Sequence, residues 1–404
     1  MASSPEIVAR FGMAGANPRA VHDVVKDLPI YADRRFRFDN GMEEFLDALR
    51  FMTKSDLRRY FPYGFLRPGT AFASLVASKK VEVVRTSGTS SDRLQLLWDA
   101  DWWERQELAA LKSHPFIGPH LTSEYTEAVL TTPLCSESVC KTGPATMEER
   151  RMDNLLFLNT QHDPSRWNSS DLSRMADEID RFRPAAIEAD PVYLAVLARY
   201  IRDNQRPVFK FKWIILTYEF VSSIDKTAIR DLFGCPVFEF YGLTEAGVFF
   251  LECPKGRHHF CGVDSVVEIF RHAEGESELR GLPSNAGEAV VTTWGNSAAP
   301  LLRYRTGDLV AVGMDPCACG APGPAVLSFE GRTRDVINLP DGKVFTPRLI
   351  DDTLAGIPGL AQYVCVQERA DSIRVDYVSA GPRDIGRNIE SRLNSIWETT
   401  RIAA

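Results

Sequence analysis

A segment of small residues follows a predicted strand and has the composition of a phosphate-binding loop. The predicted strand is Val81–Val84, and the segment after it contains Thr86, Ser87, Gly88, Thr89 and Ser90. Closely spaced backbone N–H groups and hydroxyls can surround a polyphosphate. The same composition is common in ordinary loops, so this segment indicates nucleotide binding only together with other residues.

A second candidate is the sequence Tyr-Gly-Leu-Thr-Glu at 241–245, which follows a predicted strand at 236–240. A glutamate on a turn at the end of a strand can hold Mg²⁺ against phosphate oxygens, because hard cations prefer carboxylate ligands. Glu245 is therefore a candidate magnesium ligand. The alternative is a helix that begins here with Thr244 as its N-cap.

A third candidate is the sequence Arg-Tyr-Arg-Thr-Gly-Asp at 303–308, which follows the predicted strand 288–294. A carboxylate at a tight turn can accept hydrogen bonds from both hydroxyls of a ribose. Asp308 is therefore a candidate ribose ligand, and the alternative is an ordinary Gly-Asp turn.

The order and spacing of these three segments, followed by Gly331 and Arg332, resemble the adenylate-forming superfamily. Within it, the chain resembles the branch of phenylacetate–CoA ligase and coenzyme F390 synthetase. The resemblance covers roughly residues 50–380 and includes the segments MTKSDLRRYFPYGF, DPVYLAVLARYI and SSIDKTAIRDLFGCPVFEFYGLTEAG.

The resemblance implies an AMP-forming ligase that uses ATP and Mg²⁺ to activate a carboxylic acid, aromatic or otherwise small, as acyl-AMP. The acyl group would then pass to CoA or to an amine or hydroxyl acceptor. The alternatives are an amide- or ester-forming AMP ligase that does not use CoA, and a nucleotide-binding relative without turnover.

The same resemblance assigns roles to individual residues. Thr244 and Glu245 would be catalytic, with Thr244 at the α-phosphate and Glu245 on magnesium. The ATP phosphates would be bound by Thr86, Ser87, Gly88, Thr89 and Ser90. Tyr241 and Gly242 would contact the adenine, and Asp308 would bind the ribose. Glu219 would lie near the nucleotide, and Arg332 would lie close to Asp308. Candidate walls of the acyl pocket are the segment 131–140 and the side chains of Tyr218, Phe220, Phe238, Phe240 and Tyr241.

Helix and strand signals alternate along the 404 residues, which favours an α/β fold. The resemblance implies a large body at 1–333, with two α/β subdomains and a distorted β-barrel. It also implies a small mobile α+β domain at 334–404 that is shortened at its end, with Arg334 at the hinge. The last predicted helix places four apolar side chains on one face, at Ile385, Ile389, Leu393 and Ile396.

Four of the eight cysteines fall into two short segments, 253–261 and 317–319. Such clustering is more typical of a metal site than of disulfides in a chain of this length. Three thiolates and one imidazole form the ligand set of a closed structural zinc site, here Cys253, His259, Cys317 and Cys319. His258 and Cys261 are alternative ligands that the sequence leaves open.

The chain departs from the family pattern at one catalytic position. The family has a lysine near its C-terminus, and the only lysine here after residue 331 is Lys343. Lys343 is therefore the third predicted catalytic residue, with Arg93 and Arg334 as alternative sources of positive charge. A positive charge is needed because negative charge develops during acyl transfer to phosphorus.

Composition limits the partners. The net charge of −7 argues against nucleic acid as a main partner. The sequence has no uninterrupted apolar stretch of about 18 residues, so no membrane span is predicted. Arg10 interrupts the first residues, so no signal peptide is expected and the predicted location is cytoplasmic. The expected partners are a small-molecule acid and a nucleophilic acceptor, and a homodimer is left open.

Overall fold

The computed structural model describes residues 6–38, 40–86, 93–132, 145–161, 163–271, 282–340, 342, 344–382, 384–396 and 401–403. It confirms the predicted α/β class. None of the helices in these ranges has the length and apolar composition needed to cross a bilayer.

Most of the strands belong to one 13-stranded sheet. In spatial order they are β1 (Glu6–Phe11), β12 (Ser265–Arg271), β13 (Ala286–Thr293), β14 (Leu301–Gly313), β15 (Ala325–Arg332), β11 (His258–Phe260), β10 (Gly247–Glu252), β9 (Val237–Leu243), β8 (Trp213–Leu216), β7 (Ala186–Ala189), β4 (Glu127–Leu130), β6 (Leu155–Phe157) and β5 (Arg151–Met152). Strands β9, β8, β7, β4 and β6 are parallel, whereas β1 and β10 to β15 pair antiparallel. The predicted division of this body into two subdomains and a barrel stays a prediction.

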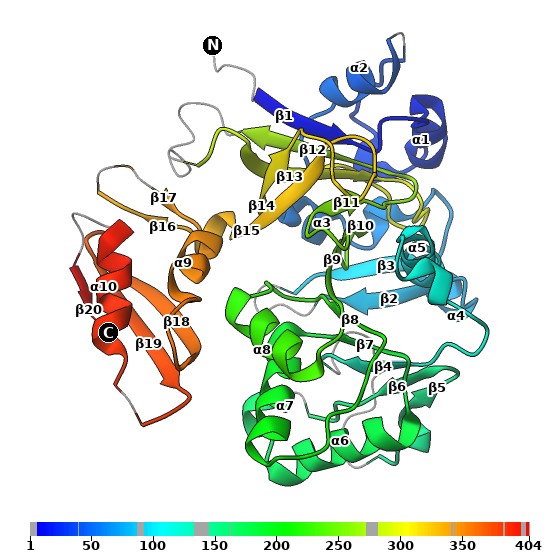
Figure 1. Cartoon of the computed structure of the whole chain (residues 1–404). Helices are drawn as coiled ribbons and strands as arrows, with labels where there is room; N and C mark the ends of the chain where they lie inside the picture. Colours follow the sequence, from blue (N-terminus) through cyan, green and yellow to red (C-terminus); the bar gives the residue numbers. More distant parts are fainter. Residues whose placement is uncertain are drawn as a thin grey trace.

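Helices cover the parallel strands on both faces, which explains why those strands are short runs of buried residues rather than alternating ones (Figure 1). One face packs on α6 (Ser169–Phe182), α7 (Pro191–Asp203) and α8 (Ser223–Phe233), and the other on α5 (Trp102–Ser113). The predicted signals hold: Asp190 caps α7 ahead of Pro191, and Gly234 ends α8 with a φ of +63°. The earlier helices are α1 (Pro18–Val25), α2 (Gly41–Asp47), α3 (Lys54–Tyr60) and α4 (Phe72–Ala77).

Two hairpins present the first two candidate segments. Strands β2 (Val81–Arg85) and β3 (Gln95–Asp99) form an antiparallel pair, and the small-residue segment connects them. Strands β9 and β10 form the other, with Thr244 and Glu245 in the turn between them. The helix that would begin at Thr244 is not formed.

The last part of the chain has a buried cluster of its own, which runs from Ile337 to Leu393. Its elements are β16 (Ile337–Asn338), β17 (Val344–Phe345), α9 (Pro347–Leu354), β18 (Leu360–Arg369), β19 (Ser372–Ser379), α10 (Gly386–Ile396) and β20 (Arg401–Ala403). In Figure 1 these orange and red elements lie to one side of the rest of the chain. The predicted apolar face is confirmed, because Ile385, Ile389 and Leu393 are buried and Ile396 packs against them. Strand β20, which pairs with β19, had no counterpart in the sequence prediction.

Candidate active site

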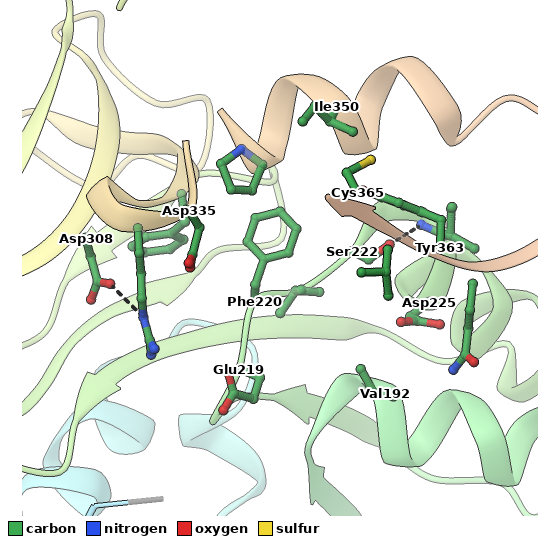
Figure 2. Close-up of a pocket in the computed structure, with 18 of the residues that line it drawn as sticks. Val192, Glu219, Phe220, Ser222, Asp225, Asp308, Asp335, Ile350, Tyr363 and Cys365 are labelled. Atoms are coloured by element: carbon green, nitrogen blue, oxygen red, sulfur yellow. Dashed lines mark hydrogen bonds and ion pairs between the residues drawn. The ribbon is translucent and has the colours of Figure 1, made fainter. Parts of the chain in front are cut away.

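A cavity of about 1110 Å³ lies between the large sheet and the C-terminal elements. One side is formed by loops and strand ends of the body, at 216–222, 224–225, 239–243, 308–309, 329 and 331–332. The other side is formed by 334–337, by Pro347 and Ile350, and by 361–367 and 376–378. Figure 2 shows Glu219, Phe220 and Asp308 on the body side and Ile350, Tyr363 and Cys365 opposite them.

Five of the predicted nucleotide residues line this one cavity although they come from four separate segments. They are Glu219, Tyr241, Gly242, Asp308 and Arg332. Thr244 and Glu245 follow Gly242 in the β9–β10 turn and are not among the lining residues. Of the small-residue segment only Thr86 is described, and Ser87, Gly88, Thr89 and Ser90 lie outside the described residues, as does Lys343.

Asp308 is held from two directions. The Tyr241 hydroxyl donates to its Oδ2 at 2.7 Å, and Nε of Arg332 lies 3.4 Å from its Oδ1. Burial raises the pKa of Asp308 to about 6, although Arg332 and the Tyr241 hydroxyl lower it. The Tyr241 ring stacks on Phe329 with centroids 4.5 Å apart. Asp308 is therefore a fixed acceptor on the cavity wall.

The turn with Thr244 and Glu245 is anchored through two aromatic side chains that the sequence analysis did not single out. The Tyr304 hydroxyl donates to Glu245 Oε1 at 2.8 Å, and the Trp98 indole Nε1 donates to the Thr244 carbonyl at 2.8 Å. Tyr304 belongs to the segment 303–308 and Trp98 to the hairpin of the small-residue segment. The second and third candidate segments are thus linked by a direct hydrogen bond, and the second is also linked to the hairpin that carries the first.

Thr86, the first residue of the small-residue segment, is hydrogen-bonded to Leu94 on the opposite side of the hairpin. Its N–H donates to the Leu94 carbonyl at 3.1 Å, and its Oγ1 accepts from the Leu94 N–H at 2.9 Å. Strand β3 is fixed in turn by Asn296, whose side chain donates to the Leu97 carbonyl and accepts from the Asp99 N–H. The hairpin therefore presents its connecting segment from a rigid base.

An ion-pair network lies behind one wall of the cavity. Lys226 Nζ lies 2.8 Å from Glu239 Oε1 and 2.7 Å from Glu252 Oε2. His258 Nε2 lies 3.3 Å from Glu239 Oε2. Of these residues, Glu239 lines the cavity, so a charged carboxylate on this wall is compensated from behind.

The predicted acyl-pocket aromatics divide into two groups. Tyr218, Phe220, Phe240 and Tyr241 line the cavity, whereas Phe238 does not. Phe238 and Phe240 do share one face and one apolar cluster, as strand alternation predicts. Most of the segment 131–140 lies outside the described residues.

The C-terminal elements are fastened to the body through Asp351 of α9, which is fully buried. Its carboxylate accepts from the Ser222 hydroxyl at 2.7 Å and from the Ser223 N–H at 2.6 Å. The Arg348 guanidinium donates to the Val221 carbonyl and lies over the Phe220 ring at 4.6 Å. These polar contacts hold the start of α8 and one end of the cavity wall in this arrangement.

Asp190, at the carboxyl end of β7, is expected to make stability fall as pH rises. Burial raises its pKa to about 7 from the usual 3.8, although the Tyr193 N–H lowers it. Because the folded state binds the proton more tightly, the stabilisation is present below about pH 4 and is lost as pH approaches 7. Asp190→Asn keeps the helix cap and should remove up to about 4 kcal/mol of this pH dependence. Urea unfolding at several pH values measures the difference.

Asp163 provides a matched control for that prediction, because it also precedes a proline and caps a short helix. Hydrogen bonds from Ser165 lower the pKa of Asp163. Asp163→Asn should therefore change the slope of the free energy of unfolding against pH in the opposite direction to Asp190→Asn. Equal slopes for the wild-type protein and Asp190→Asn would contradict the assignment.

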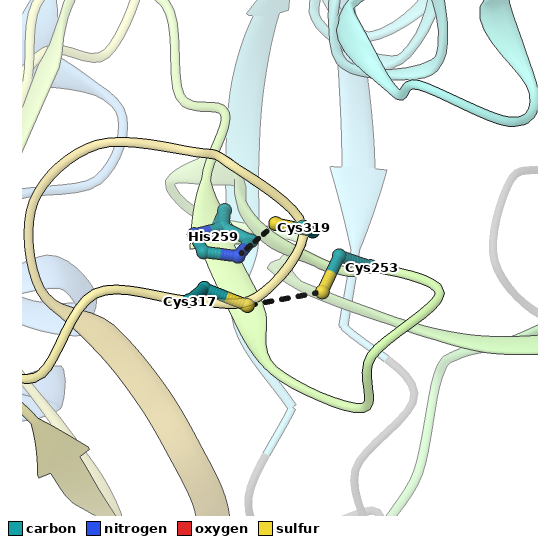
Figure 3. A group of neighbouring side chains, drawn as sticks. All are labelled: Cys253, His259, Cys317 and Cys319. Atoms are coloured by element: carbon teal, nitrogen blue, oxygen red, sulfur yellow. Dashed lines mark hydrogen bonds between the residues drawn. The ribbon is translucent and has the colours of Figure 1, made fainter.

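The four predicted metal ligands come together, as Figure 3 shows. Cys253 follows β10, His259 lies in β11, and the other two belong to the β14–β15 loop. Cys253 Sγ is 3.7 Å from Cys317 Sγ, Cys319 Sγ is 3.2 Å from His259 Nε2, and all four ligand atoms lie within 4.8 Å of one another. Tetrahedral zinc with Zn–S bonds of about 2.3 Å separates its sulfurs by about 3.8 Å, so this donor set fits zinc.

The structure also decides between the alternative ligands. His258 and His259 point to opposite sides of β11, and His258 contacts Glu239 instead of the thiols. Cys261 packs against the apolar cluster that contains Phe238 and Phe240, and burial raises its pKa to about 12. Neither His258 nor Cys261 belongs to the group of four metal-ligand candidates.

Comparisons with known proteins agree with this architecture. No family model matches the chain. A phenylacetate–coenzyme A ligase of Thermus thermophilus is 26% identical over 226 residues, which is 53% of this chain and 50% of the relative. The protein CapK of Staphylococcus aureus is 27% identical over 158 residues, 39% of this chain and 32% of the relative. The chain thus spans half or less of the length of these curated relatives.

Solved structures share the fold over most of the chain. A 2-hydroxyisobutyryl-CoA ligase in its postadenylation state superposes with a TM-score of 0.68 at 16% identity, covering 96% of this chain and 86% of that one. An amide bond synthetase from Marinactinospora thermotolerans gives 0.53 at 16% identity, covering 80% and 64%. The chain therefore shares its fold with these ligase structures. Together with the curated relatives, the shared fold supports the predicted resemblance to the adenylate-forming superfamily and to its phenylacetate–CoA ligase-like branch.

Proposed function

We propose that this chain is an AMP-forming ligase that activates a small carboxylic acid with ATP. The observation that carries the proposal is the cavity, in which Tyr241, Asp308 and Arg332 from three separate segments are joined by one hydrogen bond and one ion pair. In the reaction, a carboxylate oxygen of the acid attacks the α-phosphorus of ATP. A P–O bond forms, the bond to pyrophosphate breaks, and acyl-AMP remains bound.

Each residue contributes binding or positioning. Asp308 would accept hydrogen bonds from the ribose hydroxyls, and the Tyr241 and Gly242 surface would contact adenine. The segment Thr86–Ser90 would surround the phosphates, with Thr244 at the α-phosphate. Glu245 would hold Mg²⁺, which neutralises phosphate charge. Tyr218, Phe220 and Phe240 supply apolar walls suited to an aromatic or other small acyl group.

The acceptor is a second part of the proposal. The acyl group passes to a nucleophile with release of AMP, and the candidates are the CoA thiol, an amine and a hydroxyl. The solved structures with this fold are named as CoA ligases and as an amide bond synthetase, which supports the CoA thiol and an amine among these candidates. Assay of AMP release with CoA and with simple amines, after the acid is known, separates these candidates.

The C-terminal residues 334–404 would form the mobile domain, with Arg334 at the hinge. Such movement lets one chain perform two half-reactions at one site. Rotation would have to break the contacts of Asp351 with Ser222 and Ser223. The site at Cys253, His259, Cys317 and Cys319 would hold structural zinc, because four protein ligands leave no open position for a substrate.

ATP–pyrophosphate exchange with a panel of aryl and aliphatic acids tests the proposal. Exchange that depends on one class of acid is the expected result. Tight binding of ATP without exchange for any acid would indicate a nucleotide-binding relative without turnover. Absence of ATP binding would remove the nucleotide assignment altogether.

Substitutions can identify the residue that supplies the catalytic positive charge. Lys343 is the proposed residue, and Arg334 lines the cavity as an alternative. Exchange rates for Lys343→Ala and Arg334→Ala, with ATP affinity measured in parallel, identify the residue whose charge acts mainly in the transition state. A rate within twofold of wild type for Lys343→Ala removes Lys343 from the catalytic residues.

A further inference from the structure

The carboxylate of Glu245 has one described hydrogen bond, and its donor comes from a different candidate segment. The donor is the hydroxyl of Tyr304, 2.8 Å from Glu245 Oε1. Glu245 lies at the tip of the β9–β10 hairpin, so its own element restrains the side chain little. Its orientation therefore depends on what Tyr304 provides.

Tyr304 is itself held firmly. Its side chain is 1% exposed and belongs to the main apolar cluster. The residues on either side are pinned to Met52, because the Met52 N–H donates to the Arg303 carbonyl and the Arg305 N–H donates to the Met52 carbonyl, both at 2.9 Å. Burial, together with the nearby Glu245 carboxylate, raises the pKa of Tyr304 well above its usual value. The hydroxyl therefore stays protonated and can only be the donor in this pair.

The backbone of the turn is restrained separately. The Trp98 indole donates to the Thr244 carbonyl, and the Trp98 ring stacks on Trp103 with centroids 4.9 Å apart. Backbone and carboxylate of the turn are thus fixed by different partners. Loss of the Tyr304 hydroxyl would free the carboxylate and leave the turn in place.

We propose that Tyr304 is a positioning residue that orients Glu245 for the metal ion of Mg–ATP. The inference rests on the proposed nucleotide site, but it concerns metal binding rather than turnover. Hydrogen-bond partners that orient a metal ligand typically change metal affinity about 10- to 100-fold when they are removed. Tyr304→Phe keeps the buried ring and removes only the hydroxyl.

The test is a calorimetric titration of ATP into the full chain at a series of Mg²⁺ concentrations and in excess chelator. For Tyr304→Phe, the Mg²⁺ concentration that gives half of the metal-dependent gain in ATP affinity should rise about tenfold. ATP affinity in chelator should stay within twofold of wild type, since Asp308 is held by the Tyr241 hydroxyl and Arg332. Thermal unfolding confirms that the variant is folded.

Tyr31→Phe is the matched control, because the Tyr31 hydroxyl is also buried and donates a 2.7 Å bond to the Pro300 carbonyl, in the same cluster. It should leave the Mg²⁺ midpoint unchanged. An unchanged midpoint in Tyr304→Phe, or an equal shift in Tyr31→Phe, overturns the inference. Wild-type ATP binding that gains nothing from Mg²⁺ overturns it as well. Metal-dependent binding without pyrophosphate exchange would instead sink the proposed activity and leave the role of Tyr304 standing.

Discussion

Replacing Asp308 with alanine is expected to weaken ATP binding by about 10- to 100-fold. A hydrogen bond to a charged acceptor contributes about 1.5–3 kcal/mol, so a net loss equivalent to one of the bonds to the ribose hydroxyls corresponds to a change of about this size. The carboxylate is already oriented by the Tyr241 hydroxyl and Arg332, so binding does not have to order it. Calorimetry with ATP and Mg²⁺ measures the change.

A surface pair provides the control for Asp308→Ala. Asp177 of α6 pairs with Arg206, and neither residue lines the cavity, so Asp177→Ala should leave ATP affinity within twofold. The pH dependence adds a second check, because the pKa of Asp308 is raised to about 6 by burial. ATP affinity of the wild-type protein should fall between pH 7 and pH 5, whereas Asp308→Asn should lose that dependence. Unchanged affinity in Asp308→Ala would remove the ribose assignment.

The sequence was sufficient for features that local chemistry determines. The cap at Asp190, the end of α8 at Gly234 and the apolar face of α10 follow from rules that act within a few residues. The resemblance added which distant segments should meet, and the cavity brings Tyr241, Asp308 and Arg332 together.

Contacts between side chains of distant segments could not be predicted in the same way. Tyr304 belongs to the segment 303–308, but its sequence position does not predict its partner. The Tyr304 hydroxyl reaches Glu245 only because of the register of β14 against β13 and the bridge between Tyr304 and Met52. Trp98 gave no signal beyond its aromatic character. The choice of His259 over His258 depended likewise on which face of β11 meets the β14–β15 loop, and two adjacent histidines offer no local clue to that.

The Cys317→Ser/Cys319→Ser pair is expected to release zinc and to lower the melting temperature by about 10 °C. The two thiols hold the β14–β15 loop against Cys253 and His259, and metal binding by such ligands is coupled to folding. A loss of about 3–5 kcal/mol produces a shift of this size in a large domain. Thermal unfolding and elemental analysis of protein purified without chelator measure the two effects.

Cys261→Ser is the matched control, because Cys261 is a neighbouring cysteine that the sequence left open as a ligand. That variant should keep its zinc, and its melting temperature should change much less. The four-residue cluster also joins the strands that carry the predicted nucleotide residues: Cys253 follows β10 of the Thr244–Glu245 hairpin, and Cys317 follows β14 with Asp308. Loss of the metal should therefore weaken ATP binding indirectly. Wild-type protein that contains no zinc, or a double variant that retains it, would contradict the assignment and leave the four side chains as an ordinary cluster of three reduced thiols and an imidazole.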